Sequence, residues 1–359
     1  MESHAVIVRH DALRQFTARI LQALGMPRPI AEHTADLMVQ TDLRGVDSHG
    51  VGMLPKYVEW TQAGLIDPRA EPIVVADAGA TALMDGRRGL GHWTSTEAME
   101  LAIEKARTYG VGFVAVRNSN HFGACACYSM MALPHGMAGV AMTNSFVTAM
   151  VPTFGRQPML STNPLSVAVP AGAEAPFVLD MATTTVAIGK LTIASRWGKP
   201  IPEGWALDEQ GHPTFDPDVA LKSRLLTPLG GTREGGSHKG YGLGVVVDIL
   251  SGVLPGAVYG DLFLRADMAE RRQTNVGHFF GAIEIARLRP VEEFRAAMDD
   301  MLRALKATPP AEGAERVLVA GQPEAECEKV RLREGIPLAP MLAEQLAEIA
   351  SSLGVHPLT

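Results

Sequence analysis

The sequence predicts an α/β fold, because stretches with helical periodicity alternate with short apolar runs of strand length. The chain has 359 residues, of which 47% are hydrophobic and 20% are charged. Such a composition can bury a large core and is too apolar for a disordered chain. The length suggests about two or three packing units.

The first half of the chain contains two predicted helices followed by a strand. Apolar residues at spacings of three and four predict a helix from about residue 29 to 43. Thr94 and Glu97 match a capping box, and Gly110 stands where a glycine often ends a helix. We therefore expect a second helix that begins at Thr94. The apolar run 111–116 directly after it predicts a buried strand.

Helix and strand signals continue to the end of the chain. Helical residues follow the strand until about Leu133, and Pro134 and Gly136 break them. Further strands are expected at 138–145, 165–170 and 177–182, and helices at 294–305 and 339–354, with a linker at 306–315. The longest apolar stretch, 240–260, contains Asp248, Pro255 and several glycines, so it predicts a buried helix and not a membrane span.

Composition and motifs exclude several classes of protein. The net charge is −7 and no basic face stands out, which argues against nucleic acid as a partner. The charged N-terminal stretch lacks the apolar core of a signal peptide. Cys125 and Cys127 stand one residue apart, which is neither a CxxC motif nor a disulfide framework. Reduced thiols fit a cytoplasmic protein without a membrane anchor.

Common nucleotide and metal signatures are missing. The string "GVGFVA" at 110–115 matches GxGxxA, but a helix precedes it and a strand follows, which reverses the order that dinucleotide binding requires. The chain has no GxxxxGK[ST] phosphate loop, no GxSxG nucleophile elbow and no HExxH or HxxxH spacing. We therefore predict no metal site and no Rossmann motif.

Polar clusters inside apolar surroundings mark the candidate site. They are "RGVDSHG" (44–50), "NSNHFG" (118–123), "TNS" (143–145), "STNP" (161–164), "LDMAT" (179–183), "HKGYG" (238–242) and "NVGHFFGAI" (275–283). Each alone could be an ordinary loop. Together they carry His49, His121, His238 and His278, and several follow a predicted strand, where open α/β sheets build their sites. This pattern predicts one pocket assembled from distant segments. A metal-dependent hydrolase and a non-catalytic binding protein are the alternatives from other classes.

The motifs resemble, in order, those of the malate/L-lactate dehydrogenase family. They read "DLRGVDSHGV…Y", "NSNHFG", "TNS…P…G", "TNP", "DMAT…GK" and "HKGYGL…DILSG.L.G", and the resemblance covers about residues 5–355. That family also includes sulfolactate dehydrogenases, ureidoglycolate dehydrogenases and cyclic-imine reductases. The resemblance implies a homodimeric oxidoreductase that uses NAD or NADP and a cofactor fold that is not of the Rossmann type. It also implies a helical domain from residues 1–60 and 290–359, for dimerisation and the substrate side, around a cofactor-binding α/β domain, residues 61–289.

The resemblance further implies a reaction. A 2-hydroxy acid of the malate, lactate or sulfolactate kind and its 2-keto acid would be interconverted by hydride transfer. Reduction of a cyclic imino acid of the piperideine- or pyrroline-2-carboxylate type, or a ureidoglycolate-type dehydrogenation, is the alternative. NAD is favoured over NADP, although Lys190 and Arg196 lie where a cation for the 2′-phosphate of NADP could stand.

Two histidines are candidates for the catalytic acid and base. His121 matches the family's catalytic histidine, and a histidine can give and take a proton near neutral pH. His49 matches the proton donor suggested for the imine reductases, where a serine and an aspartate support it; here these would be Ser48 and Asp180. The sequence does not decide which histidine transfers the proton, and His121 is preferred.

The remaining site residues follow from the same resemblance. Cofactor contacts are expected from the residues Ser145, Asp180, Met181, Ala182, Lys239, Asn275, Gly277 and His278. Substrate contacts are expected from Tyr57, Thr162 and Asn163. Many members place an arginine four residues after the "SHG" histidine, where it can clamp a carboxylate, but this chain has Met53 there. Arg156 or Lys56 would then supply the cation, and simple malate or lactate specificity is in doubt.

Overall fold

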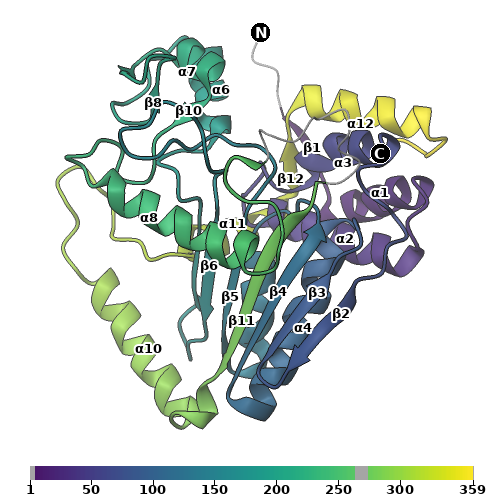
Figure 1. Ribbon diagram of the computed structural model, residues 1–359, viewed down its shortest axis with the longest axis vertical. Coiled ribbons are helices and arrows are strands. Elements are labelled where there is room, and N and C mark those ends of the chain that lie inside the picture. Colours follow the sequence, from purple (N-terminus) through teal and green to yellow (C-terminus); the bar gives the residue numbers. More distant parts are fainter. Residues whose placement is uncertain (1–4, 263–273, 359) are drawn as a thin grey trace.

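The computed structural model describes residues 5–262 and 274–358, and it is built around a seven-stranded sheet (Figure 1). The strands follow the order β2 (Ile73–Ala78), β3 (Thr81–Asp85), β4 (Val111–Ser119), β11 (Val276–Glu284), β5 (Met137–Thr143), β6 (Leu165–Val169) and β7 (Phe177–Met181). The β3–β4 pair is parallel and the other neighbouring pairs of this sheet are antiparallel. A Rossmann sheet is mostly parallel. The predicted α/β class with a non-Rossmann fold is therefore confirmed.

One face of the sheet is covered by α4 (Gly91–Tyr109), with α5 (Ala126–Ser129) and the 3₁₀ helix η2 (Met130–His135) beside it. Helix α4 packs its small side chains on β4 and β11, so Ala98 and Ala102 lie in one core with Val114 and Phe280. The strands expected at 111–116, 138–145, 165–170 and 177–182 are confirmed as β4, β5, β6 and β7.

The helix α4 corrects one prediction and confirms another. Its end is as predicted, because Gly110 adopts the left-handed conformation with φ 85° after the last turn. The capping box is wrong, since the helix begins at Gly91 with Leu90 at its N-cap and no side-chain cap. Thr94 is instead a buried residue inside the helix. Burial of Leu90 fixes where the chain enters this helix, and tertiary packing overrides the local signal.

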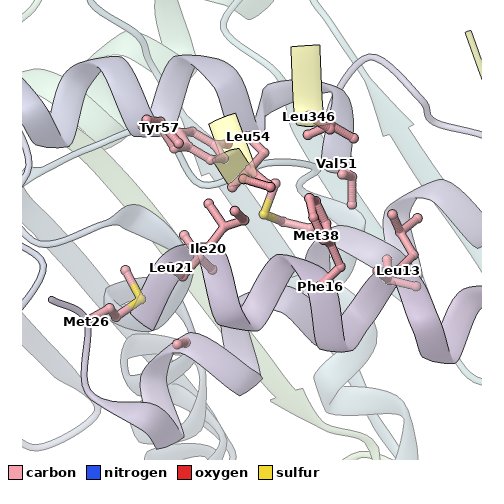
Figure 2. Close-up of a cluster of buried hydrophobic side chains, with 14 of the residues drawn as sticks. Leu13, Phe16, Ile20, Leu21, Met26, Met38, Val51, Leu54, Tyr57 and Leu346 are labelled. Atoms are coloured by element: carbon pink, nitrogen blue, oxygen red, sulfur yellow. The ribbon is translucent and has the colours of Figure 1, made fainter. Parts of the chain in front are cut away.

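Helices from both ends of the chain share one core. They are α1 (His10–Ala23), α2 (Arg28–Leu43), α3 (Leu54–Gln62) and α12 (Pro340–Ser352), joined by the short ladder β1 (Val6–Val8) with β12 (Ile336–Leu338). Figure 2 shows this core, in which Phe16, Met38 and Tyr57 pack with Leu346 of the C-terminal helix. The 3₁₀ helix η1 (Val51–Met53) leads into α3, and α11 (Gln322–Glu334) packs against α2. The helices predicted at 29–43 and 339–354 are confirmed.

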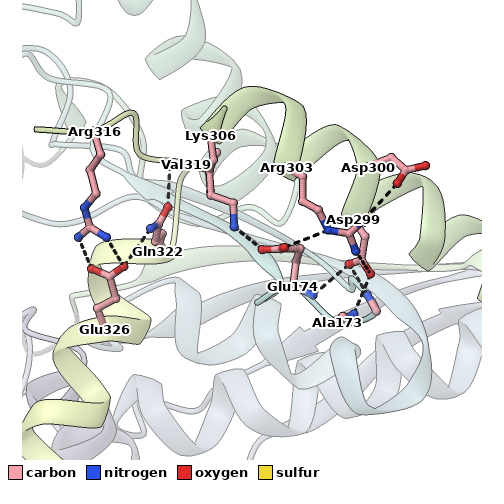
Figure 3. Close-up of polar contacts among 11 residues, drawn as sticks. Ala173, Glu174, Asp299, Asp300, Arg303, Lys306, Arg316, Val319, Gln322 and Glu326 are labelled. Carbon is pink, nitrogen blue, oxygen red and sulfur yellow. Dashed lines mark hydrogen bonds and ion pairs between the residues drawn. The ribbon is translucent and has the colours of Figure 1, made fainter. Parts of the chain in front are cut away.

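Helix α10 (Val291–Lys306) is attached elsewhere, to the loop between β6 and β7 (Figure 3). The Asp299 carboxylate accepts hydrogen bonds from the backbone N–H groups of Gly172, Ala173 and Glu174 at 2.8–3.1 Å. Glu174 in turn pairs with Arg303 and Lys306. The chain then runs to α11 without a helix or strand, which confirms the linker predicted at 306–315.

A small lobe and helix α8 with its π-helical continuation make up the remaining described elements. The lobe contains α6 (Ile188–Arg196), α7 (Pro217–Ser223) and a sheet of β10 (Leu225–Leu226), β8 (Ala206–Leu207) and β9 (Pro213–Thr214); the 3₁₀ helix η4 (Ile285–Arg287) follows β11. Helix α8 (Ser237–Asp248) continues into a π-helical turn, η3 (Ile249–Val253), which packs on β11 and β5. The helix predicted within 240–260 is thus present but buried on one face only, because Val246 and Val253 are about half exposed. In the described part of the chain, no helix has the length and hydropathy to cross a membrane.

Candidate active site

A pocket of about 740 Å³ opens between the N-terminal helices and the end of β7. The segments that line it are the end of α2 with the loop to η1, residues 123–127, Thr162 with Pro164, residues 178–182 and 187–189, and residues 318–324 at the start of α11. Among the predicted site residues, those in its wall are Ser48, His49, Thr162, Asp180, Met181 and Ala182. Segments far apart in the sequence therefore meet at one cavity. A second pocket of about 580 Å³, beside β3, contains no predicted site residue.

His121 lies directly behind His49, with the two rings stacked 5.6 Å apart. The Nδ1 atom of His121 is 2.8 Å from the Tyr57 hydroxyl and 3.4 Å from the backbone N–H of Gly123. Because that N–H can only donate, Nδ1 acts as an acceptor and the ring proton resides on Nε2. Burial lowers the pKa of His121 well below its usual value, and the neighbouring His49, His92 and His278 lower it further. At neutral pH the ring is uncharged and has one N–H to offer.

His49 is held by the loop between α2 and η1. Its Nδ1 atom lies 2.8 Å from the Ser48 hydroxyl, and burial lowers the pKa of its imidazole. The loop is tied to α2 by the buried Asp42, whose carboxylate accepts the Val51 N–H at 2.8 Å. Burial raises the pKa of Asp42 to about 7. A Cβ on Gly50 would lie 2.0 Å from that carboxylate, so only glycine fits there.

Asp180 stands at the end of β7 in the pocket wall. Its carboxylate accepts the backbone N–H of Ala126 at 2.7 Å, at the start of α5. Burial raises the pKa of Asp180 to about 6, opposed by that hydrogen bond and by the charge of Arg44. In the described residues no hydrogen bond joins Asp180 to His49, although both face the same cavity.

Three expected cofactor contacts support the fold around the site. The ring of His278 is fully buried, with Nδ1 2.7 Å from the Thr143 hydroxyl and Nε2 2.8 Å from the Ser119 hydroxyl. It stacks on Phe122, the residue after His121, at 4.7 Å. Gly277 faces η3, and the Asn275 side chain accepts the Asn118 N–H at 2.7 Å. Neither ring nitrogen of His278 is free for a ligand.

The other expected residues lie outside the pocket lining. Tyr57 is buried with its hydroxyl on His121, and the Asn163 amide donates to the Gly244 carbonyl at 2.9 Å. Arg156 is exposed, and so are Lys239 and Lys56, the latter paired with Glu59 at 2.7 Å. Ser145 caps only its own turn, where its hydroxyl accepts the Val147 N–H at 3.5 Å. Neither cation expected to replace the family arginine lines this pocket.

The start of helix α6 and the start of helix α11 both open on the pocket, a feature that the sequence motifs did not indicate. Ala187, Ile188 and Gly189 line it from α6, and Gly321 and Glu324 line it from α11. The unpaired N–H groups of a helix N-terminus bind phosphate oxygens well. One carboxylate oxygen of Glu324 is buried without a hydrogen-bond partner in the described residues. This chemistry fits a ligand with phosphates and hydroxyl groups, such as a dinucleotide.

Comparison with known proteins identifies the family of the chain. A family model described as malate/L-lactate dehydrogenase matches residues 8–347. The malate dehydrogenase of Pyrococcus abyssi is 40% identical over 356 residues, covering 99% of this chain and 97% of the relative. The L-sulfolactate dehydrogenase of Methanocaldococcus jannaschii is 38% identical and covers 98% of each chain.

Solved structures point the same way. The malate dehydrogenase of Entamoeba histolytica superposes with a TM-score of 0.94 at 33% identity, covering 98% of this chain and 99% of that one. A Δ1-piperideine-2-carboxylate reductase from Pseudomonas syringae gives 0.83 at 28% identity, covering 96% and 100%. The fold and the named relatives together define an oxidoreductase of the hydroxy acid dehydrogenase class. The chain belongs to the malate/L-lactate dehydrogenase family, as the motifs predicted.

Proposed function

We propose that the protein is a cytoplasmic, NAD(P)-dependent dehydrogenase that interconverts a 2-hydroxy acid and its 2-keto acid. The substrate is of the malate, lactate or sulfolactate kind. The observation that carries this proposal is the stacked pair His49 and His121 beside a pocket that also holds Asp180. A bound nicotinamide would supply or accept the hydride.

The chain itself handles the proton. His121 exchanges it with the substrate oxygen through Nε2, while Tyr57 holds Nδ1 from the opposite side. Burial lowers the pKa of His121, so the resting ring is neutral and must take up a proton from solvent before the keto acid is reduced. The imidazolium formed in this way is a stronger acid than free histidine and gives that proton to the forming alkoxide. His49, fixed by Ser48, binds the substrate in this scheme, and Thr162 lies in the same wall.

The cofactor would occupy the part of the pocket formed by residues 180–182 and the starts of α6 and α11. Ser145 and Lys239, which the family resemblance assigns to the cofactor, do not line this pocket and would contact only a part of the cofactor that extends beyond it. NAD is our favoured cofactor, because the buried carboxylate oxygen of Glu324 suits a ribose hydroxyl better than a phosphate. Lys190 directly follows Gly189 of the pocket wall and, with Arg196, is the feature that would instead favour NADP.

Turnover with a substrate panel tests this function. We expect the purified protein to oxidise NADH or NADPH with at least one of pyruvate, oxaloacetate, sulfopyruvate, 2-ketobutyrate and piperideine-2-carboxylate. The reaction is followed by the absorbance of the reduced nicotinamide at about 340 nm. Comparing KM for the two cofactors decides the preference, and a tenfold advantage for NADPH would overturn our choice of NAD. Folded protein that neither turns over this panel nor binds either cofactor would refute the function.

A second function is supported by Met53. This apolar side chain lines the pocket where many family members carry a carboxylate-binding arginine. A cyclic imino acid, or a ureidoglycolate-type substrate, would meet a less cationic pocket than malate meets in those members. Exclusive turnover of piperideine-2-carboxylate in the same panel would establish the imine reductase alternative.

We also propose that the enzyme is a homodimer. We place the dimer contact not on the helical domain, where the family resemblance put it, but on α8 and η3, which present an apolar face to solvent with Val246 46%, Ile249 47%, Val253 50% and Leu254 59% exposed. Monomers rarely leave such a contiguous patch open. Light scattering should give about twice the 38.3 kDa chain mass, and Ile249→Glu with Val253→Glu should give the monomer. Met341→Glu, at an exposed residue of α12, is the control and should stay dimeric. A monomeric wild-type protein at micromolar concentration would exclude this assembly.

A further inference from the structure

Arg44, at the end of α2, projects a largely buried guanidinium into the wall of the pocket. Its side chain is only 10% exposed, and it lines the same cavity as Ser48 and His49. Its Nη1 atom lies 3.3 Å from the Glu328 carboxylate. In the described residues this is the one hydrogen bond or ion pair of the Arg44 guanidinium. A guanidinium has five N–H groups on three nitrogens, and the contact with Glu328 uses one of those nitrogens. Arg44 therefore has donors left for a ligand.

Arg44 also supplies the one lysine or arginine charge among the described residues of this cavity. Asp180 and Glu324, which line it too, are both acidic. The charge of Arg44 already works against the raised pKa of Asp180. Without this guanidinium the described side chains of the wall would carry only negative formal charge, from Asp180 and Glu324. Arg44 therefore favours the entry of a small acid.

We propose that Arg44 binds the carboxylate of the substrate. The inference rests on the proposed function and names the group that recognises its acid. A planar guanidinium can hold a carboxylate through two parallel N–H···O bonds, in the cavity that His49 also lines. The substrate class is thus a 2-oxo or 2-hydroxy carboxylate, and the matching ester or amide would not bind.

Replacing Arg44 tests the assignment. Arg44→Met should raise KM for the accepted 2-keto acid about 10- to 100-fold, the worth of a charge-assisted bond, and Arg44→Lys should raise it less. The Kd of NADH, followed by its fluorescence, should stay within about threefold. Arg44→Met with Met53→Arg should regain part of the lost affinity, because residue 53 lines the same pocket. Glu328→Gln is the matched control: its amide oxygen can still accept the Arg44 hydrogen bond, so the guanidinium stays in place and KM should change far less than in Arg44→Met.

Two results would overturn the assignment. If Arg44→Met and Glu328→Gln lower the unfolding temperature equally and neither changes KM, Arg44 only joins α2 to α11. If Arg44→Met weakens NADH and leaves the keto acid unaffected, the guanidinium holds the cofactor's diphosphate instead. Oxamate, a 2-keto acid analogue that is not reduced, gives a readout independent of turnover. Stabilisation of the wild type by oxamate, lost in Arg44→Met, supports carboxylate binding even if the panel shows no reduction.

Discussion

Replacement of His121 by asparagine should lower kcat about 100- to 10,000-fold, the usual contribution of general acid–base catalysis. Asparagine can still accept the Tyr57 hydroxyl and donate one hydrogen bond to the substrate oxygen. An asparagine cannot take up and release a proton, however. In the wild type Tyr57 and Gly123 both contact Nδ1 of His121, so Nε2 is the atom left to exchange a proton with the substrate. Steady-state reduction of the best 2-keto acid measures the loss.

The matching variant is His49→Asn. We expect it to raise KM more than it lowers kcat, because the His49 side chain lines the pocket and, in the described residues, makes its one hydrogen bond to the Ser48 hydroxyl. Binding of NADH should change little in either variant. If His49→Asn abolishes turnover while His121→Asn only weakens cofactor binding, the roles are reversed and the enzyme works like the imine reductases.

Most of the framework follows from local patterns. Apolar runs bounded by glycine and proline predicted β4 to β7, and helical periodicity predicted α2 and α12. The start of α4 could not be predicted, because the buried Leu90 and not a capping side chain fixes it. The apolar pattern of α8 likewise could not show that one face stays exposed, since periodicity does not report what packs on a helix.

The site was predicted less completely than the fold. Motif order brought His49, Thr162 and Asp180 to one pocket, and the family resemblance supplied their roles. It could not show that His278 spends both ring nitrogens on Thr143 and Ser119, because those contacts join residues more than a hundred positions apart. Arg44 belongs to the first motif, 44–50. What distinguishes it from a surface arginine is its burial and its single ion-pair partner in the described residues, and the sequence shows neither.

The largest effect on stability is expected at Gly277, in β11. A Cβ at this position would lie 1.7 Å from the Ser251 carbonyl oxygen and 2.6 Å from the Ala257 side chain. Both neighbours belong to the packed segment around η3, so neither can move aside as a flexible side chain could. Gly277→Ala should therefore cost at least about 3 kcal/mol of unfolding free energy, measured by urea denaturation, or prevent folding. The Gly277 N–H also donates to the Asn144 side chain at 3.1 Å, so Asn144, which precedes Ser145, would shift too.

Gly242→Ala on helix α8 is the control for this prediction. A Cβ there meets nothing within 4 Å, and alanine is the better helix former by roughly 1 kcal/mol. Because α8 also carries the proposed dimer face, both glycine variants are compared in the monomeric Ile249→Glu with Val253→Glu background. In that background the stability of Gly242→Ala should equal or exceed that of the parent protein. If Gly277→Ala unfolds at the same urea concentration as Gly242→Ala, the close approach of β11 to η3 is not a constraint on the fold. Gly277 would then have to be explained by contact with a ligand, which is the role that its motif first suggested.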